Sequence, residues 1–179
     1  MFNSDTISDL LAKPIFDGRT VATQRLGIHA IVTAWNKDHI SEHEKVLAFV
    51  LAVVAHETAR TMLPTEGEPN DQTNFVGRGY IHLRSANQMG MFGQQLGLDL
   101  HQNPQLQLHP DVAARVLLLG LLEGWFTGFR AQQFFSKSTS RVNAAWSTIY
   151  IPGDPRMAGY DRVEQFYDAT LAAVLEAHS

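Results

Sequence analysis

An almost wholly apolar segment, Val46 to Ala55, constrains the fold of this chain more than any other feature. At about ten residues it is too short to cross a bilayer, so we expect a helix buried in a protein core. His56, Glu57 and Thr58 follow at once. A carboxylate at the end of a buried helix costs free energy unless a partner or a function compensates it.

The composition indicates a single globular domain over residues 1–179. Of the 179 residues, 45% are hydrophobic and 18% are charged, which is ordinary for a folded domain with a sizeable core. The formal net charge of -4, without a basic stripe, gives no electrostatic basis for binding nucleic acid. The chain has no cysteine, so disulfides and thiolate metal sites are excluded.

Metal and cofactor chemistry fit the motifs poorly. His56-Glu57 begins like the zinc motif H-E-x-x-H, but Arg60 stands where the second histidine is needed. Gly77-x-Gly79 lacks the third glycine of a dinucleotide site, and no P-loop lysine or nucleophile elbow occurs. We therefore expect a protein without metal or cofactor.

The first twenty residues lack the basic start and long apolar core of a secretory signal. We therefore expect synthesis in the cytoplasm and no membrane insertion. A target outside the cell would be reached only after release or delivery by something else.

Helical periodicity dominates, so we expect a mainly α domain with at most a small β element. The predicted helices span residues 4–13, 21–36, 41–61, 86–96, 110–122, 130–135, 141–146 and 156–177. The first should end at Pro14, and Leu26 should share the apolar face of the second with Ile28. Residues 64–79 read as a loop and 80–83 as a short extended piece. The helix over 110–122 is apolar nearly all round, which predicts a central position.

Glu57 is the first candidate for chemistry. The carbonyl groups at the end of its helix and its burial both favour the protonated carboxyl group, as a general acid requires. The alternative is a structural ion pair with Arg60 or Arg78. Glu66 and Glu68 lie in a polar loop, where a solvated carboxylate stays ionised and can activate water. We favour Glu66 as that base, and a loop acid without a role is the alternative.

Several other residues are weaker candidates. Gly77 and Gly79 predict a turn in which backbone approaches a neighbour closely, with Arg78 orienting a carboxylate. Trp125 could stack on a sugar face, although core packing is more common for such a residue. Asn87 and Asn143 carry amide groups of the kind that bind N-acetyl substituents.

Taken together, these segments resemble glycoside hydrolase family 19, especially its compact bacterial and phage members. They occur in the family's order along most of the chain. The matching pieces are Phe16-Asp17-Gly18, Ala55-His56-Glu57-Thr58-Ala59, Thr61-Met62-x-Pro64-x-Glu66, Gly77-Arg78-Gly79-Tyr80-Ile81-x-Leu83, Leu98-Asp99-Leu100, Asn103-Pro104, Glu123-Gly124-Trp125-Phe126-Thr127-Gly128 and Val142-Asn143-Ala144.

The resemblance implies a lysozyme-like, two-lobed α fold and inverting hydrolysis of a β-1,4 bond beside an N-acetylated sugar. Glu57 falls on the family's general acid and Glu66 on the second acid. Thr73 lies about where phage-type lysozymes hold a water. In such enzymes the two carboxyl groups lie roughly 6.5–9.5 Å apart, which leaves room for that water.

The resemblance also implies a substrate-binding set made of Arg78, Tyr80, His82, Asn87, Trp125 and Asn143. His82 stands where the family usually has Gln, and the segment from Trp146 to Asp154 replaces its usual turn. The first of these departures falls where the family binds substrate.

Three functions remain open. The leading hypothesis is a muramidase that degrades bacterial cell-wall peptidoglycan, as a phage endolysin or a toxin delivered between bacteria. The second is a chitinase acting on chitin-type oligosaccharides, against which the short connection between Glu57 and Gly77 argues. The third is a catalytically inactive sugar-binding or partner-binding protein.

Overall fold

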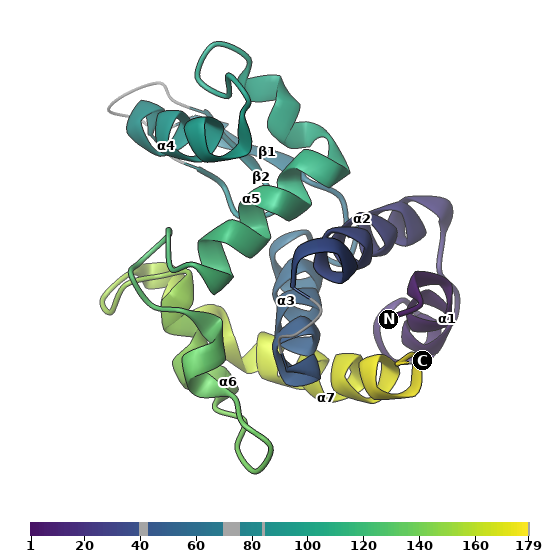
Figure 1. Cartoon of the computed structure of the whole chain (residues 1–179). Helices are drawn as coiled ribbons and strands as arrows, with labels where there is room; N and C mark the ends of the chain where they lie inside the picture. Colours follow the sequence, from purple (N-terminus) through teal and green to yellow (C-terminus); the bar gives the residue numbers. More distant parts are fainter. Residues whose placement is uncertain (40–42, 70–75, 84, 179) are drawn as a thin grey trace.

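A computed structural model describes residues 1–39, 43–69, 76–83 and 85–178. Its centre is helix α3, Glu44–Glu57, in which every residue from Val46 to Ala55 is at most 1% exposed. The helix packs most extensively on α7, Tyr160–Glu176, as Figure 1 shows. The apolar segment is therefore the core helix that the sequence predicts.

The two ends of the chain meet beside α7. Helix α1, Ser4–Ile15, packs on both α2, Ala22–Asp38, and α7. Phe2 forms a β-bridge with His178, and the backbone N–H of Asn3 donates to the carbonyl of Ala177 at 3.2 Å (Figure 1). These contacts join the two ends of the chain within the larger part of the molecule.

Helix α5, Pro110–Leu122, connects this larger part with a smaller one. Its residues belong to two hydrophobic clusters, since Leu117 packs in the main core and Val116 in a second cluster with Phe92. The smaller part contains the hairpin β1, Thr65–Pro69, and β2, Val76–Gly79, with α4, Ala86–Leu96, and the 3₁₀ helix η1, Pro104–Leu108 (Figure 1). The predicted central position of residues 110–122 is confirmed.

Short helical pieces fill the remaining segment between α5 and α7. They are η2, Ala131–Phe134; α6, Val142–Ala145; η3, Trp146–Thr148; and η4, Pro155–Gly159. None of the helices in the described residues is long and apolar enough to cross a membrane.

Five predictions about local structure are wrong. Helix α1 continues through Pro14 to Ile15, because a proline in the last turn removes only one hydrogen-bond donor. Leu26 is 52% exposed, because two residues along a helix turn it by about 200° away from Ile28. The loop predicted over 64–79 contains the antiparallel hairpin, whereas residues 80–82 form a turn.

The third helix also ends earlier than predicted, at Glu57 instead of residue 61. Its predicted start at residue 41 lies outside the described residues. In the described part, His43 caps the helix and its ring accepts a hydrogen bond from the N–H of Lys45 at 3.2 Å.

Candidate active site

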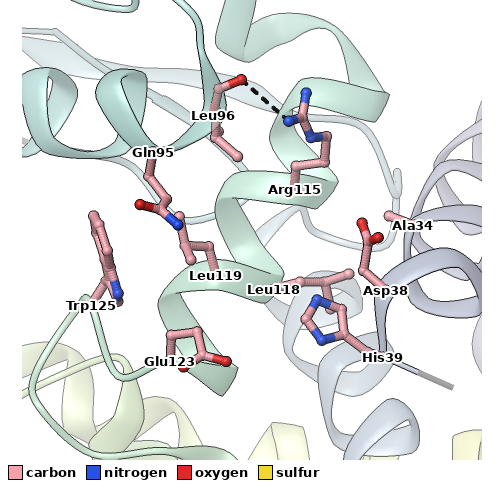
Figure 2. A pocket seen from close by; sticks show the side chains of 10 residues that line it. All are labelled: Ala34, Asp38, His39, Gln95, Leu96, Arg115, Leu118, Leu119, Glu123 and Trp125. Carbon is pink, nitrogen blue, oxygen red and sulfur yellow. Dashed lines mark hydrogen bonds between the residues drawn. The ribbon is translucent and has the colours of Figure 1, made fainter. Parts of the chain in front are cut away.

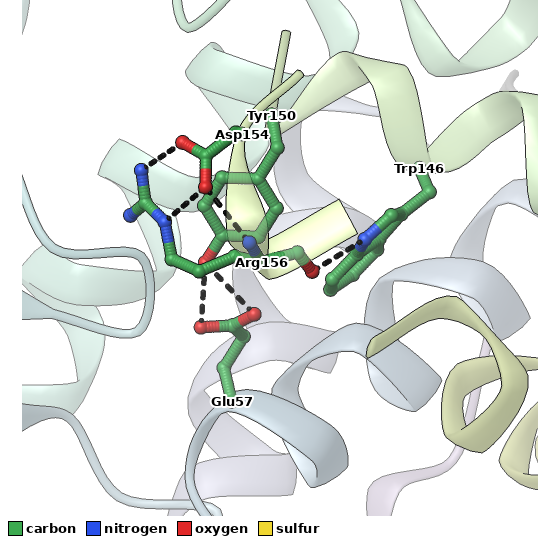
Figure 3. A network of polar contacts seen from close by, with 5 residues as sticks. All are labelled: Glu57, Trp146, Tyr150, Asp154 and Arg156. Carbon is green, nitrogen blue, oxygen red and sulfur yellow. Dashed lines mark hydrogen bonds and ion pairs between the residues drawn. The ribbon is translucent and has the colours of Figure 1, made fainter. Parts of the chain in front are cut away.

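Glu57 is the last residue of α3, and its half-buried carboxylate is held by a tyrosine from a distant segment. The hydroxyl of Tyr150 donates to Glu57, lying 3.0 Å from Oε1 and 2.9 Å from Oε2 (Figure 3). Tyr150 is itself 6% exposed, so its ring is fixed by packing. A charge-assisted hydrogen bond of this kind orients a carboxylate and stabilises it more than a neutral one would.

Three further side chains hold Tyr150 in place. The guanidinium carbon of Arg156 lies 4.2 Å from the centre of the Tyr150 ring, and Asp154 accepts hydrogen bonds from Arg156 (Figure 3). Trp146 meets the same ring edge-on at 5.2 Å and donates from Nε1 to the carbonyl of Arg156 at 3.3 Å. Glu57 is therefore supported by a packed network.

The hydrogen bond with Asp154 raises the pKa of Arg156, and the negative charges of Asp154 and Glu57 act in the same direction. The guanidinium therefore keeps its positive charge close to Glu57. A fixed cation beside a carboxylate is a recurring element of sites in which a charge changes during reaction.

The turn after Glu57 is unusually constrained. Ala59, Arg60 and Met62 all have φ in the left-handed region, at 48°, 70° and 58°. The backbone N–H of Arg60 donates to the carbonyl of Ala55 at 2.7 Å, and Met62 is fully buried. Non-glycine residues persist in this conformation only where their surroundings enforce it, as at functional sites.

Gly27 of α2 enforces part of this turn. A Cβ atom at position 27 would lie 1.7 Å from the carbonyl oxygen of Met62, so only glycine permits the contact. The chain therefore turns sharply away from Glu57 and leads directly into strand β1.

The structural alternative for Glu57, a pair with Arg60 or Arg78, is weakened because both arginines pair with other acids. Arg60 contacts Asp17 at 3.1 Å, and Arg78 forms an ion pair with Glu66. The prediction that Arg78 orients a carboxylate is confirmed, and that carboxylate belongs to Glu66.

Glu66 lies on β1 directly opposite Arg78 on β2 in the strand register. The Glu66 side chain is 46% exposed, whereas that of Arg78 is only 13% exposed. Arg78 also donates to the carbonyl of Val76 at 3.0 Å. The Glu66 carboxylate is therefore open to solvent and held in place by the more buried Arg78.

The glycines of the hairpin make room for His82, as the sequence predicts for a close approach. A Cβ at Gly77 would lie 2.7 Å from the Cβ of His82, and one at Gly67 would lie 2.5 Å from its ring nitrogen. The hydroxyl of Thr65 lies 3.0 Å from Nε2 of His82. The His82 ring thus packs across the hairpin that carries Glu66, and its contact with substrate stays a prediction.

Tyr80 does not fit its predicted place in the substrate-binding set. It is 2% exposed in the core, and burial, followed by the charge of Asp111, raises its pKa. Its hydroxyl has no hydrogen-bond partner among the described residues. The Tyr80 ring packs in the hydrophobic core, so this residue supports the hairpin from its buried side.

The remaining predicted residues lie apart from one another. Asn87 is exposed in the first turn of α4, and Asn143 is exposed on α6. Thr73 lies outside the described residues. Binding of N-acetyl groups by the two asparagines, and the role of Thr73, stay predictions.

Trp125 borders a separate cavity. Its ring is partly buried against Phe92, with the ring centres 5.5 Å apart. Its other neighbours include Gln95 and Glu123, around a cavity of about 480 Å³ (Figure 2). Neither candidate acid is among the described residues that line this cavity. Trp125 therefore packs partly against the second hydrophobic cluster and lines a cavity that neither Glu57 nor Glu66 lines.

Sequence reasoning missed Tyr150, Asp154 and Arg156. The only local signal was their grouping around the Pro-Gly break at residues 152–153, in the segment where the chain departs from the family pattern. Nothing in that pattern indicates that Tyr150 reaches a carboxylate 93 residues away.

These elements define a mainly α, lysozyme-like fold in which one acid ends the core helix and another lies on a hairpin. Among solved structures, the fold is similar to chitinase C from Streptomyces griseus, a family 19 glycoside hydrolase, with a TM-score of 0.60 and 20% identity. That match covers 93% of this chain and 77% of the other. The predicted resemblance is thus confirmed at the level of the fold.

A Glu-to-Gln mutant of chitinase C is similar as well, with a TM-score of 0.60 and 18% identity. This match covers 99% of the present chain and 93% of the mutant chain. No protein-family model matches the sequence, and no curated protein gives a significant match.

Proposed function

We propose that this protein is an inverting glycoside hydrolase that cleaves β-1,4 bonds of bacterial peptidoglycan. The observation that carries the proposal is that two acids in a chitinase-like fold are held in different surroundings. Glu57 ends a buried helix beneath the Tyr150 hydroxyl, whereas Glu66 is solvated on the hairpin beside Arg78. Two carboxyl groups in unlike environments meet the requirement of glycoside hydrolysis.

In this proposal Glu57 is the general acid. It donates its proton to the glycosidic oxygen as the bond to the anomeric carbon breaks, and the leaving sugar departs as an alcohol. Tyr150 and Arg156 then stabilise the carboxylate that remains, because they already contact or face it in the resting protein.

Glu66 is the general base. It accepts a proton from a water molecule as the water oxygen bonds to the anomeric carbon from the opposite face, which inverts the configuration. Arg78 holds Glu66 in position through the cross-strand ion pair. Inversion requires space for that water, so the two carboxyl groups are expected roughly 6.5–9.5 Å apart.

Peptidoglycan is the preferred substrate because the connection from Glu57 to the hairpin is short, with β1 beginning at Thr65. Chitin is the alternative, favoured by the names of the two similar structures. In either case the protein acts on a polymer outside the cytoplasm, and for peptidoglycan this means the cell wall after release or delivery.

The test is digestion of purified peptidoglycan by wild type and by Glu57→Gln, with mass spectrometry of the soluble fragments. New reducing ends at N-acetylmuramic acid, made by wild type alone, are expected. The variant should retain the circular dichroism spectrum of wild type and lose activity by roughly 10²–10⁴-fold, because it keeps the shape and lacks the proton.

Two results would contradict the proposal. Cleavage of chitin oligomers without cleavage of peptidoglycan would assign the protein as a chitinase. Cleavage of neither polymer, with retained binding to one of them, would assign it as a sugar-binding protein without catalysis.

A further inference from the structure

A second cavity, of about 340 Å³, lies directly beside the candidate acid but on another side of α3. His56, which precedes Glu57, contributes to its wall together with Arg60 from the following turn. Helix α7 supplies Arg162, Gln165 and Phe166. The proposed mechanism uses none of these side chains.

The wall of this cavity carries positive charge. Two guanidinium groups and no carboxylate are among the described residues that line it. Arg60 contacts Asp17 through Nη1 at 3.1 Å, so part of its charge is compensated. Arg162 is exposed, and no ion pair joins it to an acid in the described part of the chain.

The acids nearest to Arg162 in sequence do not offset it within the cavity. Asp161 and Glu164 lie one and two residues away on α7, and each residue turns a helix by about 100°. Their side chains therefore leave the helix on other sides, and neither of them lines the cavity.

The pKa of His56 responds to the same positive charge. Burial lowers its pKa, and the charge of Arg162 lowers it further. The ring meets Trp146 edge-on at 5.5 Å and lies so close to Gly159 that a Cβ there would be 2.6 Å from Nε2. The imidazole is therefore held neutral and fixed, and the two guanidinium groups supply the charge of the cavity.

Trp146 lies between the cavity and the candidate acid, although it does not itself line the cavity. The centre of the Trp146 ring lies 5.5 Å from that of His56, which lines the cavity, and 5.2 Å from that of Tyr150, which holds the carboxylate of Glu57. A branch on a substrate bound at Glu57 would thus lie close to the cavity. A linear, uncharged chitin strand carries neither the branch nor the charge.

We propose that the cavity lined by Arg60 and Arg162 binds a carboxylate of the peptide attached to peptidoglycan. This proposal rests on the proposed function and names the feature of the substrate that the site recognises beyond the sugar. Guanidinium groups bind carboxylates through paired hydrogen bonds, and Gln165 adds an amide donor. A peptide of four or five residues spans roughly 13–18 Å when extended, which allows a branch at the glycan to reach the cavity.

A binding experiment tests the cavity without catalysis. The probe is the tripeptide L-alanyl-γ-D-glutamyl-diaminopimelic acid with both amino groups acetylated, and its neutral control is the same acetylated peptide with every carboxylate converted to a carboxamide. The acid form should shift the NMR signals of the His56 ring and raise its pKa, because a nearby anion favours the protonated imidazole. The carboxamide should do neither.

The matched variants are Arg162→Gln and Arg141→Gln. Each removes one exposed guanidinium, but Arg141 lies outside the cavity and contacts Phe134 and the Gln133 carbonyl. Arg162→Gln should weaken binding of the acid peptide by roughly tenfold or more, because it removes a charged hydrogen-bond partner. Arg141→Gln should bind as wild type does. Equal binding of both peptides, or no loss in Arg162→Gln, would overturn the proposal.

An activity experiment separates this proposal from the proposed function. Intact peptidoglycan is compared with glycan strands from which an amidase has removed the peptides. Arg162→Gln should lose activity several-fold on the intact polymer and match wild type on the stripped strands. If it matches wild type on both, the cavity proposal fails and the hydrolase stands. If wild type cleaves neither, the hydrolase fails and the peptide-binding result alone decides the cavity.

Discussion

The two candidate acids are held in opposite ways. Glu57 ends a helix whose residues from Val46 to Ala55 are at most 1% exposed, and its partner Tyr150 is 93 residues away in sequence. Glu66 is 46% exposed on a two-stranded hairpin, and its partner Arg78 is only 12 residues away. One acid is fixed by the core and the other by a local turn.

This difference matches the two tasks in glycoside hydrolysis. An acid needs surroundings that control when its proton is given up, whereas a base needs water and a retained charge. In the proposed mechanism, Glu57 on the core helix takes the first task and Glu66 on the hairpin takes the second. Four experiments test or refine this comparison.

The largest expected effect is on the hairpin acid. Glu66→Gln should lower activity by roughly 10²–10⁴-fold, because the amide cannot accept a proton from water. Glu68→Gln on the same strand is the matched control and should change activity less than about threefold, since Glu68 is exposed and has no assigned role. Rates of fragment release measure both. An equal loss in the two variants would assign the base to the wrong residue.

The next effect concerns the turn that fixes the helix acid. Gly27→Ala should destabilise the protein by about 2 kcal/mol or more, because the new methyl group would lie 1.7 Å from the Met62 carbonyl oxygen. Gly90→Ala on α4 meets nothing within 4 Å and should stabilise it by about 0.5–1 kcal/mol. Urea unfolding measures both. A neutral Gly27→Ala would show that the turn after Glu57 is adaptable.

A smaller effect is expected from the tyrosine above the helix acid. Tyr150→Phe removes the hydroxyl that contacts both oxygens of Glu57 and keeps the ring between Arg156 and Trp146. Loss of a hydrogen bond to a charged group corresponds to roughly a tenfold or greater loss of kcat. Unchanged KM and stability would identify Tyr150 as a positioning residue. Unchanged kcat would show that the core alone positions Glu57.

The smallest effect is on the pH dependence of stability near the helix acid. The pKa of His56 is lowered from 6.5 by burial and by Arg162, so the unfolded chain takes up a proton before the folded one as pH falls. The corresponding stability is present above pH 6.5 and is lost as pH falls through the folded pKa. His56→Asn should therefore lose less stability than wild type between pH 7.5 and 5, measured by urea unfolding. Equal losses would mean that other groups cause the acid sensitivity.

Local patterns predicted much of the architecture. The helices at α2, α4 and α5 lie within a few residues of their predicted bounds, because apolar periodicity and terminating glycines or prolines act over one or two turns. The close approach expected at Gly77 is present at His82, and Gly79 has the positive φ that a glycine turn requires. The hairpin was missed because Thr65–Pro69 contains charged and turn-forming residues and little apolar alternation.

The candidate site was predicted only in part. Glu57, Glu66 and Arg78 could be singled out because they lie close to strong local signals, the core helix and the glycine turn, but only the structure showed that Arg78 pairs with Glu66. Tyr80 resembled a binding residue, yet the fold buries it, since a sequence motif does not specify which side of a turn faces solvent. Tyr150 and Arg156 were missed because their role depends on contacts across the whole chain.

The sequence by itself determined that this protein has a buried helix ending in an acid, a second acid near a glycine turn, and an α-rich core. Those features follow from hydrophobic periodicity and backbone conformation, which act between near neighbours. Only the tertiary structure placed Tyr150 against Glu57 and brought His56, Arg60 and Arg162 around one cavity. Such groupings arise when distant segments pack together to bury apolar surface, and no short stretch of the chain encodes them.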